Sequence, residues 1–274
     1  MVEITFDRVN TFFRRMKFEN QLIKQLIAEF FASFILVFMI DSAVATYGFL
    51  SKEADMLAIA VVAGVALYLA LMVGAAAGAG HSTPIVTVAL ASVNKFPWTQ
   101  VPSFMLVHHL GGMAAAVLTY INCYDAVELL ENKFGNKSVA LIFTSFPSEH
   151  TTPLGAFVDQ FICCALIMYA VMVFLDEKHP LFVASAVKPS LGFILCGIVL
   201  CFELNTGAAV NPSRDLIGRL FLYIVGYGND VFSPLDGNYW WTAGLIGPHL
   251  GAIAGTWLYY ITIEAHHEDI SGQN

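Results

Sequence analysis

The stretch Asn211-Pro212-Ser213-Arg214-Asp215 lies between two apolar runs, and it decides how the chain folds. Asn is a preferred N-cap and Pro is preferred at the first helical position, so a helix is expected to begin at Pro212. Arg214 would then lie in the first turn, near the positive end of the helix dipole, where a cation gains no helix stability. We therefore expect Arg214 to have a role other than stabilising this helix.

The composition is typical of a membrane protein. Of the 274 residues, 57% are hydrophobic and only 12% are charged, and the formal net charge is −8. Soluble domains average about 25% charged residues. Several apolar runs approach the roughly 20 residues that a helix needs to cross a bilayer. The chain is therefore expected to be an all-α, multi-pass membrane protein embedded in a lipid bilayer.

The apolar segments fall into two classes by length. Six are expected to cross the membrane, at residues 26–47, 57–77, 102–121, 154–175, 191–204 and 240–263. Two are shorter, at residues 84–93 and 212–224, and each begins at a proline. Because they are too short to span, we expect them to be re-entrant half-helices, with Thr83 as the N-cap of the first.

The chain divides into two halves with the same order of segments. Thr83 and Asn211, the residues before the two prolines, are 128 residues apart. Glu29 lies 54 residues before Thr83, and Asp159 lies 52 residues before Asn211. Three spans in each half make the second half enter from the opposite side, so the pattern predicts an inverted repeat. The N-termini of the two half-helices would then meet near the bilayer midplane.

This arrangement favours a pore. The Gly- and Ala-rich stretches 78–82 and 204–210 precede the half-helices, and non-helical backbone at membrane depth is tolerated only inside protein or beside a water-filled cavity. Their carbonyl groups would accept hydrogen bonds from a passing solute. Two positive helix ends would repel cations and interrupt a chain of hydrogen-bonded water, and Arg214 would add a fixed charge. The sequence thus predicts a passive channel for small uncharged solutes that excludes ions and protons.

The expected domain plan is a basic tail (1–24), a single channel domain (25–263) and a short tail (264–274). Within the channel domain, repeat one covers 25–121, a polar connector covers 122–153, and repeat two covers 154–263. Lys and Arg are more frequent on the side of the N-terminus, where they occur at Arg8, Arg14, Arg15, Lys17, Lys24, Lys95, Lys178 and Lys188. This bias predicts that both tails are cytoplasmic.

Two motifs resemble the signatures of the aquaporin (major intrinsic protein) superfamily. His81-Ser82-Thr83-Pro84-Ile85-Val86-Thr87 is similar to the first, His-x-Asn-Pro-Ala-Val-Thr, and the stretch from Asn211 to Asp215 is similar to the second, Asn-Pro-Ala-Arg-Asp. Glu29 follows Ala28 as in the family's first span, and Asp215 directly after Arg214 is typical of the aquaglyceroporin branch.

The resemblance implies the aquaporin fold of six transmembrane helices and two half-helices, homotetrameric assembly, and a place in the plasma membrane. Glycerol and water are the implied solutes, with urea and similar molecules as candidates. The implied midplane residues are Thr83, Pro84, Ile85, Asn211, Pro212 and Ser213. The implied selectivity filter is Ala63, Val199, Ala208 and Arg214. The implied pore support is His81, Glu29, Asp159, Gln160 and Asp215.

The chain departs from the family pattern at several of these positions. The first signature reads Thr-Pro-Ile in place of Asn-Pro-Ala, and Ala63 and Ala208 stand where the branch usually has large aromatic residues. The filter is therefore expected to be wide and apolar on three sides. A structural ion pair of Arg214 with Asp215 or Glu203 is the alternative to a role in the pore.

Two alternative functions remain open at this point. Inverted repeats with broken helices also build secondary transporters, and the altered first signature fits a poorly conducting homologue with a structural role. No catalytic constellation, phosphate loop or metal-ligand spacing is present, so no enzymatic activity, cofactor or nucleic-acid partner is expected. His108 is expected in a loop or an interface.

Overall fold

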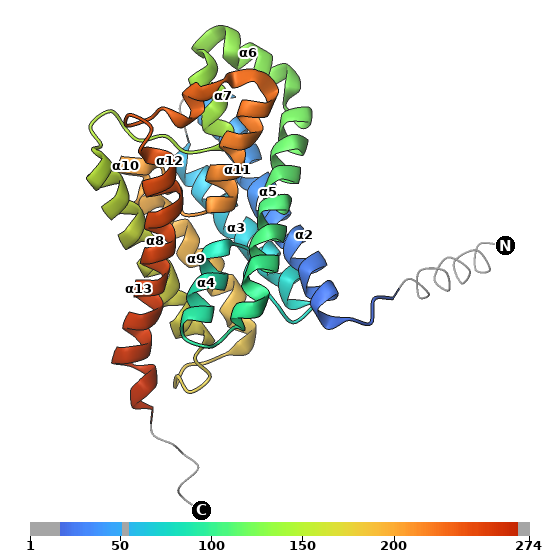
Figure 1. Ribbon diagram of the computed structural model, residues 1–274, viewed down its shortest axis with the longest axis vertical. Helices are drawn as coiled ribbons and strands as arrows, with labels where there is room; N and C mark the ends of the chain where they lie inside the picture. The colour runs from blue at the N-terminus through green and yellow to red at the C-terminus, as the bar shows by residue number, and fades with distance from the viewer. Residues whose placement is uncertain (1–16, 51–54, 268–274) are drawn as a thin grey trace, which may run out of the picture.

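The computed structural model describes residues 17–50 and 55–267, and this part of the chain contains helices and no strand (Figure 1). The long helices are α2 (Gln21–Ala43), α3 (Met56–Ala75), α5 (Val101–Asn122), α8 (Pro153–Leu175), α9 (Ala184–Cys201) and α13 (Gly247–Thr262). The half-helices are α4 (Pro84–Ser92) and α11 (Pro212–Leu222). Shorter helices are α6 (Tyr124–Phe134), α7 (Asn136–Phe143), α10 (Glu203–Thr206) and α12 (Tyr239–Trp241).

Five helical segments in the described part of the chain are long and apolar enough to cross a membrane, judged by length and composition. They contain α2, α3, α5, α8 and α9. The sixth predicted span is a composite, because a π-helical turn at Thr242–Ile246 joins α12 to α13. Together these three pieces run from Tyr239 to Thr262, which agrees with the predicted segment 240–263.

One predicted boundary is wrong, and one predicted connector contains more helix than expected. The fifth span begins at Ala184, seven residues before the predicted start. The prediction began too late because Lys188 and Pro189, which lie inside the helix, are typical of a polar link. The connector 122–153, expected to be a polar link, contains α6 and α7. Both helices are amphipathic, and their apolar sides join a buried cluster, so the connector is a packed cap.

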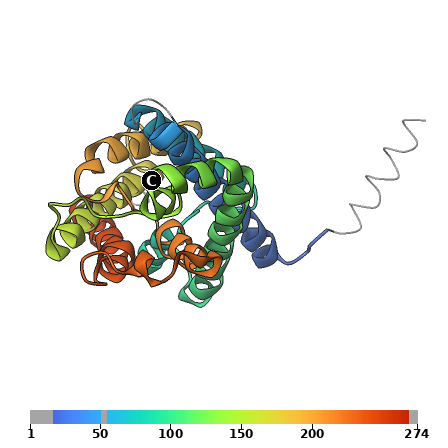
Figure 2. The same cartoon turned by 90° about the horizontal axis from the view of Figure 1, so that it is seen from above.

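The molecule has two distinguishable ends. The start of α2 and the end of α13 lie at one end, here called the terminal face, whereas α6, α7 and α10 lie at the other, here called the connector face (Figure 1). Viewed along the long axis, helices of both halves surround a common centre (Figure 2). Large apolar side chains such as Leu106 and Phe193 point outward from the spans, as expected for a surface in contact with lipid.

Glycines bring the spans close together in the same way in both halves. In repeat one, a Cβ on Gly111 of α5 would lie 2.5 Å from the carbonyl oxygen of Phe30 in α2. In repeat two, Gly251 of α13 is pressed against the carbonyl of Phe161 in α8. Small residues allow helix backbones to approach closely in lipid, and this packing holds the first and third span of each half together.

Candidate transmembrane pore

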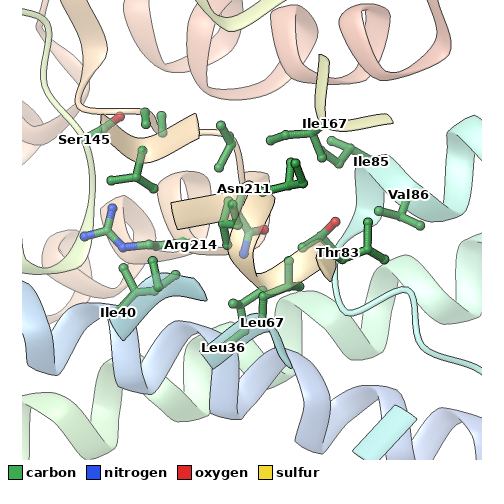
Figure 3. A pocket seen from close by; sticks show the side chains of 18 of the residues that line it. Leu36, Ile40, Leu67, Thr83, Ile85, Val86, Ser145, Ile167, Asn211 and Arg214 are labelled. Atoms are coloured by element: carbon green, nitrogen blue, oxygen red, sulfur yellow. The ribbon is translucent and has the colours of Figure 1, made fainter. Parts of the chain in front are cut away.

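A cavity of about 710 Å³ runs through the molecule between the two faces. Its lining includes Leu175 and Lys188 near the terminal face, and Lys137 and Glu203 near the connector face. Most of the remaining wall is apolar and comes from α2, α3, α8 and α9; Figure 3 shows Ile40, Leu67 and Ile167 on this wall. Residues of both non-helical stretches before α4 and α11 complete the lining.

The first stretch, residues 78–82, presents its backbone to the cavity. Gly78 and Gly80 line the cavity and have no side chain, so the atoms that they contribute are backbone atoms. Gly78, Gly80 and Ser82 have φ values of 76°, 129° and 61°, in the left-handed region that L side chains rarely adopt. The alternation keeps the chain out of a regular helix, so its carbonyl groups stay free of helical hydrogen bonds.

Glu29 holds this stretch from behind. Its carboxylate accepts hydrogen bonds from the backbone N–H groups of Gly80 (2.5 Å), His81 (3.0 Å) and Ser82 (2.7 Å). Glu29 is fully buried and does not line the cavity. His81 does line it, and its ring nitrogen Nδ1 lies 2.9 Å from the hydroxyl of Thr87.

Two glutamines on the same face of α2 extend this support, and the sequence reasoning missed both. Gln21 donates to the carbonyl of Ala77 (2.6 Å), and Gln25 donates to the carbonyl of Gly78 (3.0 Å). With Glu29 they form a row at i, i+4 and i+8, which is one helix face. This spacing of polar residues at the start of an apolar span is the signal that could have found them.

The expectation for His108 is wrong. Its side chain is fully buried in α5, and its Nε2 lies 2.7 Å from a carboxylate oxygen of Glu29. The expectation failed because the apolar sequence around His108 does not reveal that a buried carboxylate on α2 faces it. Buried charges need such partners, since leaving one unpaired is costly.

The second stretch, residues 204–210, is held by neighbouring residues of α8. Asp159 accepts hydrogen bonds from the side chains of Asn205 (2.9 Å) and Thr206 (2.6 Å), and Gln160 accepts one from the N–H of Val210 (2.8 Å). Ala208 and Val210 have φ values of 49° and 37°. Positive φ at one and three residues before the N-cap, Thr83 or Asn211, therefore occurs in both halves of the chain.

The two half-helices contact each other, but their caps differ. The Asn211 side chain accepts a hydrogen bond from the N–H of Ser213 (3.0 Å), whereas Thr83 makes no side-chain cap, against expectation. Asn211 Nδ2 and Thr83 Oγ1 are buried without a hydrogen-bond partner, and both residues line the cavity (Figure 3). Ile85 lines it as well, while Pro84, Pro212 and Ser213 are buried but do not line it.

All four predicted filter residues, Ala63, Val199, Ala208 and Arg214, line the cavity. Arg214 pairs with Asp41 of α2, with Nε 2.7 Å from Oδ1, and donates from Nη2 to the carbonyl of Ile142 (2.8 Å). Its ion-pair partner is therefore neither Asp215 nor Glu203. Asp41 escaped the sequence reasoning because it lies in the first span, far from the motif.

Asp215 forms an ion pair with a different cation, Arg219. Its carboxylate lies 3.1 Å from Nε of Arg219, one turn along α11, and accepts hydrogen bonds from Thr144 and Ser145. Arg219 is fully buried, its guanidinium lies over the rings of Phe146 (5.2 Å) and Tyr239, and it donates to the carbonyl of Ser145. Asp215 and Arg219 thus fasten α11 to the end of the connector, behind the cavity.

Two acidic residues outside the spans have shifted pKa values. Burial raises the pKa of Glu203 in α10, against the opposing charge of Arg214. At the terminal face, burial would raise the pKa of Asp176, but hydrogen bonds from Tyr259 (2.6 Å) and His267 (2.5 Å) outweigh it and keep this pKa below its ordinary value. Asp176 therefore ties the end of α13 and the segment after it to the end of α8.

Comparisons with known proteins agree with this geometry. Residues 16–259 match the family described as "Major intrinsic protein". The chain is 31% identical to Aquaporin-2 of Milnesium tardigradum over 268 residues, which covers 95% of this chain and 83% of that protein. It is 28% identical to Aquaporin-10 of Homo sapiens, covering 93% and 85% of the two chains. The X-ray structure of the aquaglyceroporin from Plasmodium falciparum shares the fold, with a TM-score of 0.79, 24% identity, and coverage of 89% of this chain and 97% of that one.

Proposed function

We propose, because this chain belongs to the major intrinsic protein family, that its cavity is a passive channel for water and glycerol. The protein is an integral, multi-pass membrane protein of a transport family. Relatives that carry the names aquaporin and aquaglyceroporin support these two solutes. The observation that carries the proposal is a cavity whose lining residues extend from the terminal face to the connector face and include both non-helical stretches and a largely apolar wall.

The lining suits solutes that combine hydroxyl groups with a hydrocarbon side. Carbonyl groups of the two non-helical stretches would accept hydrogen bonds from glycerol, and its CH groups would face the apolar wall. Where the half-helices meet, Asn211 Nδ2 and Thr83 Oγ1 are buried without a protein hydrogen-bond partner, and we expect them to form hydrogen bonds with a solute that passes between the half-helices. The two helix ends there carry partial positive charge and would oppose cations.

Stopped-flow light scattering on proteoliposomes tests the proposal. An osmotic step with sucrose measures water flux, and an inward glycerol gradient measures glycerol flux, each against empty liposomes. Both permeabilities should exceed the empty-liposome values, and glycerol flux should rise linearly with its gradient. Saturable uptake coupled to a sodium or proton gradient would instead support a secondary transporter. Permeabilities equal to those of empty liposomes would support a non-conducting homologue with a structural role.

We assign the filter to Ala63, Val199, Ala208 and Arg214, and the midplane to Thr83, Pro84, Ile85, Asn211, Pro212 and Ser213. The assignment is supported by the four filter residues and by Thr83, Ile85 and Asn211, which line the cavity, while Pro84, Pro212 and Ser213 are buried beside them. The hydrogen bonding of the supporting residues also supports it, at His81, Glu29, Asp159, Gln160 and Asp215. The variant Ala63→Trp/Ala208→Phe restores two aromatic rings. It should reduce glycerol flux more than water flux, and an unchanged ratio of the two would contradict the filter assignment.

We further propose a homotetramer in the plasma membrane with both tails cytoplasmic. Residues 25–263 would form one channel domain between the tails 1–24 and 264–274. The excess of Lys and Arg on the side of the termini supports this orientation. A cysteine at Asn274 of the cysteine-free protein should react with a membrane-impermeant maleimide only after cells are permeabilised. Light scattering of the detergent-solubilised protein would give the number of subunits.

A further inference from the structure

Asp41 lies behind the filter. It is fully buried in α2, next to Ile40, and does not itself line the cavity, whereas Ile40 does. Its Oδ1 lies 2.7 Å from Nε of Arg214, and 173 residues separate the two in the sequence. Figure 3 shows the Arg214 side chain beside Ile40 at the cavity wall.

The remaining contacts of Arg214 are neutral. Its Nη2 donates to the carbonyls of Ile142 (2.8 Å) and Leu141 (3.4 Å). Among the described residues, Asp41 is the one carboxylate within ion-pair distance of Arg214. Glu203 lies farther away in the cavity wall, and Asp215 is bound to Arg219. The guanidinium is therefore neutralised by a single residue.

An arginine that is only 8% exposed needs such compensation, because an isolated buried charge is far less stable than a paired one. The pair has a second consequence for transport. Beyond a few ångströms, a close pair of opposite charges produces a much weaker potential than a lone charge. Where Arg214 borders the cavity, a passing ion would therefore meet a nearly neutral wall.

We propose that Asp41 is a specificity-determining residue that cancels the charge of Arg214, so that the filter selects solutes by width and hydrogen-bond geometry and not by positive potential. Ion exclusion then rests on the two half-helix ends and on the apolar lining. Asp41 acts through Arg214, so it is a positioning residue. This inference rests on the proposed channel function.

Ion flux into proteoliposomes tests the role of Asp41. Chloride influx is read with an enclosed chloride-quenched dye, and water and glycerol flux are measured on the same samples. Asp41→Asn leaves the charge of Arg214 uncompensated and should raise chloride influx on the order of tenfold. Asp41→Glu retains the charge and should stay near wild type. Asp125→Asn makes the same chemical change at an exposed position of α6 and is the matched control.

A double variant separates the charge effect from a packing defect. In Asp41→Asn/Arg214→Gln both charges are absent, so chloride influx should return to the wild-type value. A leak caused by loosened packing would persist in the double variant, and that result would overturn the proposal. A chloride influx in Asp41→Asn equal to that of wild type would also overturn the proposal.

A further comparison covers the case in which Asp41→Asn does not fold. Arg214→Gln leaves the carboxylate of Asp41 uncompensated, so its sodium influx should exceed that of Asp41→Asn/Arg214→Gln. Equal sodium influx in these two variants would overturn the proposal. Failure of the channel function is distinguishable, because the wild-type protein would then conduct neither water nor glycerol.

Discussion

Arg214 and Arg219 lie five residues apart in the same half-helix and serve different purposes. Arg214 borders the cavity and pairs with Asp41, whereas Arg219 is fully buried and pairs with Asp215. Asp215, which marks the aquaglyceroporin branch, thus belongs to the fastening of α11, and Asp41 compensates the charge beside the cavity. At the scale of single residues, the identity of the partner decides what each charge does.

Ala208 offers a direct test of the cavity lining. It is 7% exposed and borders the cavity, and none of the five native cysteines is among the lining residues. Ala208→Cys should therefore make water and glycerol flux sensitive to mercuric chloride, while the wild-type protein stays insensitive. Stopped-flow measurement before and after mercury, with reversal by a thiol reductant, checks this. Ala126→Cys in α6, away from the lining, should add no sensitivity; a lack of block in Ala208→Cys would remove Ala208 from the pore.

Asp176 should make stability depend on pH. Its pKa in the folded protein lies below the reference value of 3.8. The carboxylate therefore contributes stability above the unfolded pKa, and this contribution is lost as the pH falls through the lower folded value. Asp176→Asn removes a charged acceptor and should lower stability at pH 7 by about 2 kcal/mol.

Thermal unfolding in detergent at a series of pH values checks the Asp176 prediction. The melting temperature of Asp176→Asn should lie below that of wild type by the largest amount at pH 7, and this difference should shrink as the pH falls below about 4. Asp125→Asn, at an exposed position, should show little difference from wild type throughout. A gap of the same size at pH 3 and pH 7 would show that the loss does not depend on the charge.

At the scale of elements, the two half-helices are similar in position and different in detail. Both begin at a proline, and each follows a stretch with positive φ, held by carboxylate and amide groups of a span. Only α11 has a side-chain cap, from Asn211. The hydroxyl of Thr83 can donate and accept a hydrogen bond, whereas the free Asn211 Nδ2 can only donate. The pseudo-symmetric pair therefore presents two chemically different groups to a solute.

The close contacts that glycines make between spans, here called glycine seams, should be lost when a single methyl group is added. A Cβ on Gly251 would collide with the carbonyl of Phe161, whereas a Cβ on Gly197 in α9 would meet nothing within 4 Å. Gly251→Ala should lower stability by roughly 1–3 kcal/mol through overpacking. Gly197→Ala should be neutral or stabilising by up to about 1 kcal/mol, because alanine is the better helix former. Thermal unfolding of the two variants checks this, and equal melting temperatures would contradict the seam.

At the scale of the whole molecule, one chain encloses one complete cavity. The lining comes from both repeats, and it extends between the terminal face and the connector face without a partner chain. The connector helices α6 and α7 cap the repeats at one end, and Asp176 ties the segment after α13 at the other. Transport is therefore expected to be a property of each chain separately.

Mixed assemblies test this independence. Wild-type chains co-expressed with the plugged variant Ala63→Trp/Ala208→Trp should give a glycerol permeability that falls in proportion to the plugged fraction. Two affinity tags allow purification of assemblies that contain both kinds of chain. A fall steeper than proportional would show that chains conduct through a shared path or control one another.

Local signals in the sequence predicted most of the fold. The spans in α2, α3, α5 and α8 begin and end within a few residues of their predicted boundaries. A span is visible in the sequence because it is one continuous run of apolar residues of the length that crosses a bilayer. The helix starts at Pro84 and Pro212 were predicted because capping involves adjacent residues. The same reasoning missed α6 and α7, since short amphipathic helices in a polar connector resemble loops in composition.

The sequence by itself determined the order of spans, the inverted repeat and the two motifs that line the cavity. Only the tertiary structure decided which groups face one another behind that lining. Asp41 lies 173 residues from Arg214, and Glu29 lies 79 residues from His108. Which helix faces meet depends on the seams of glycine that press particular spans together. A buried charge takes whatever partner that packing brings within reach, so its identity cannot be obtained from neighbouring residues.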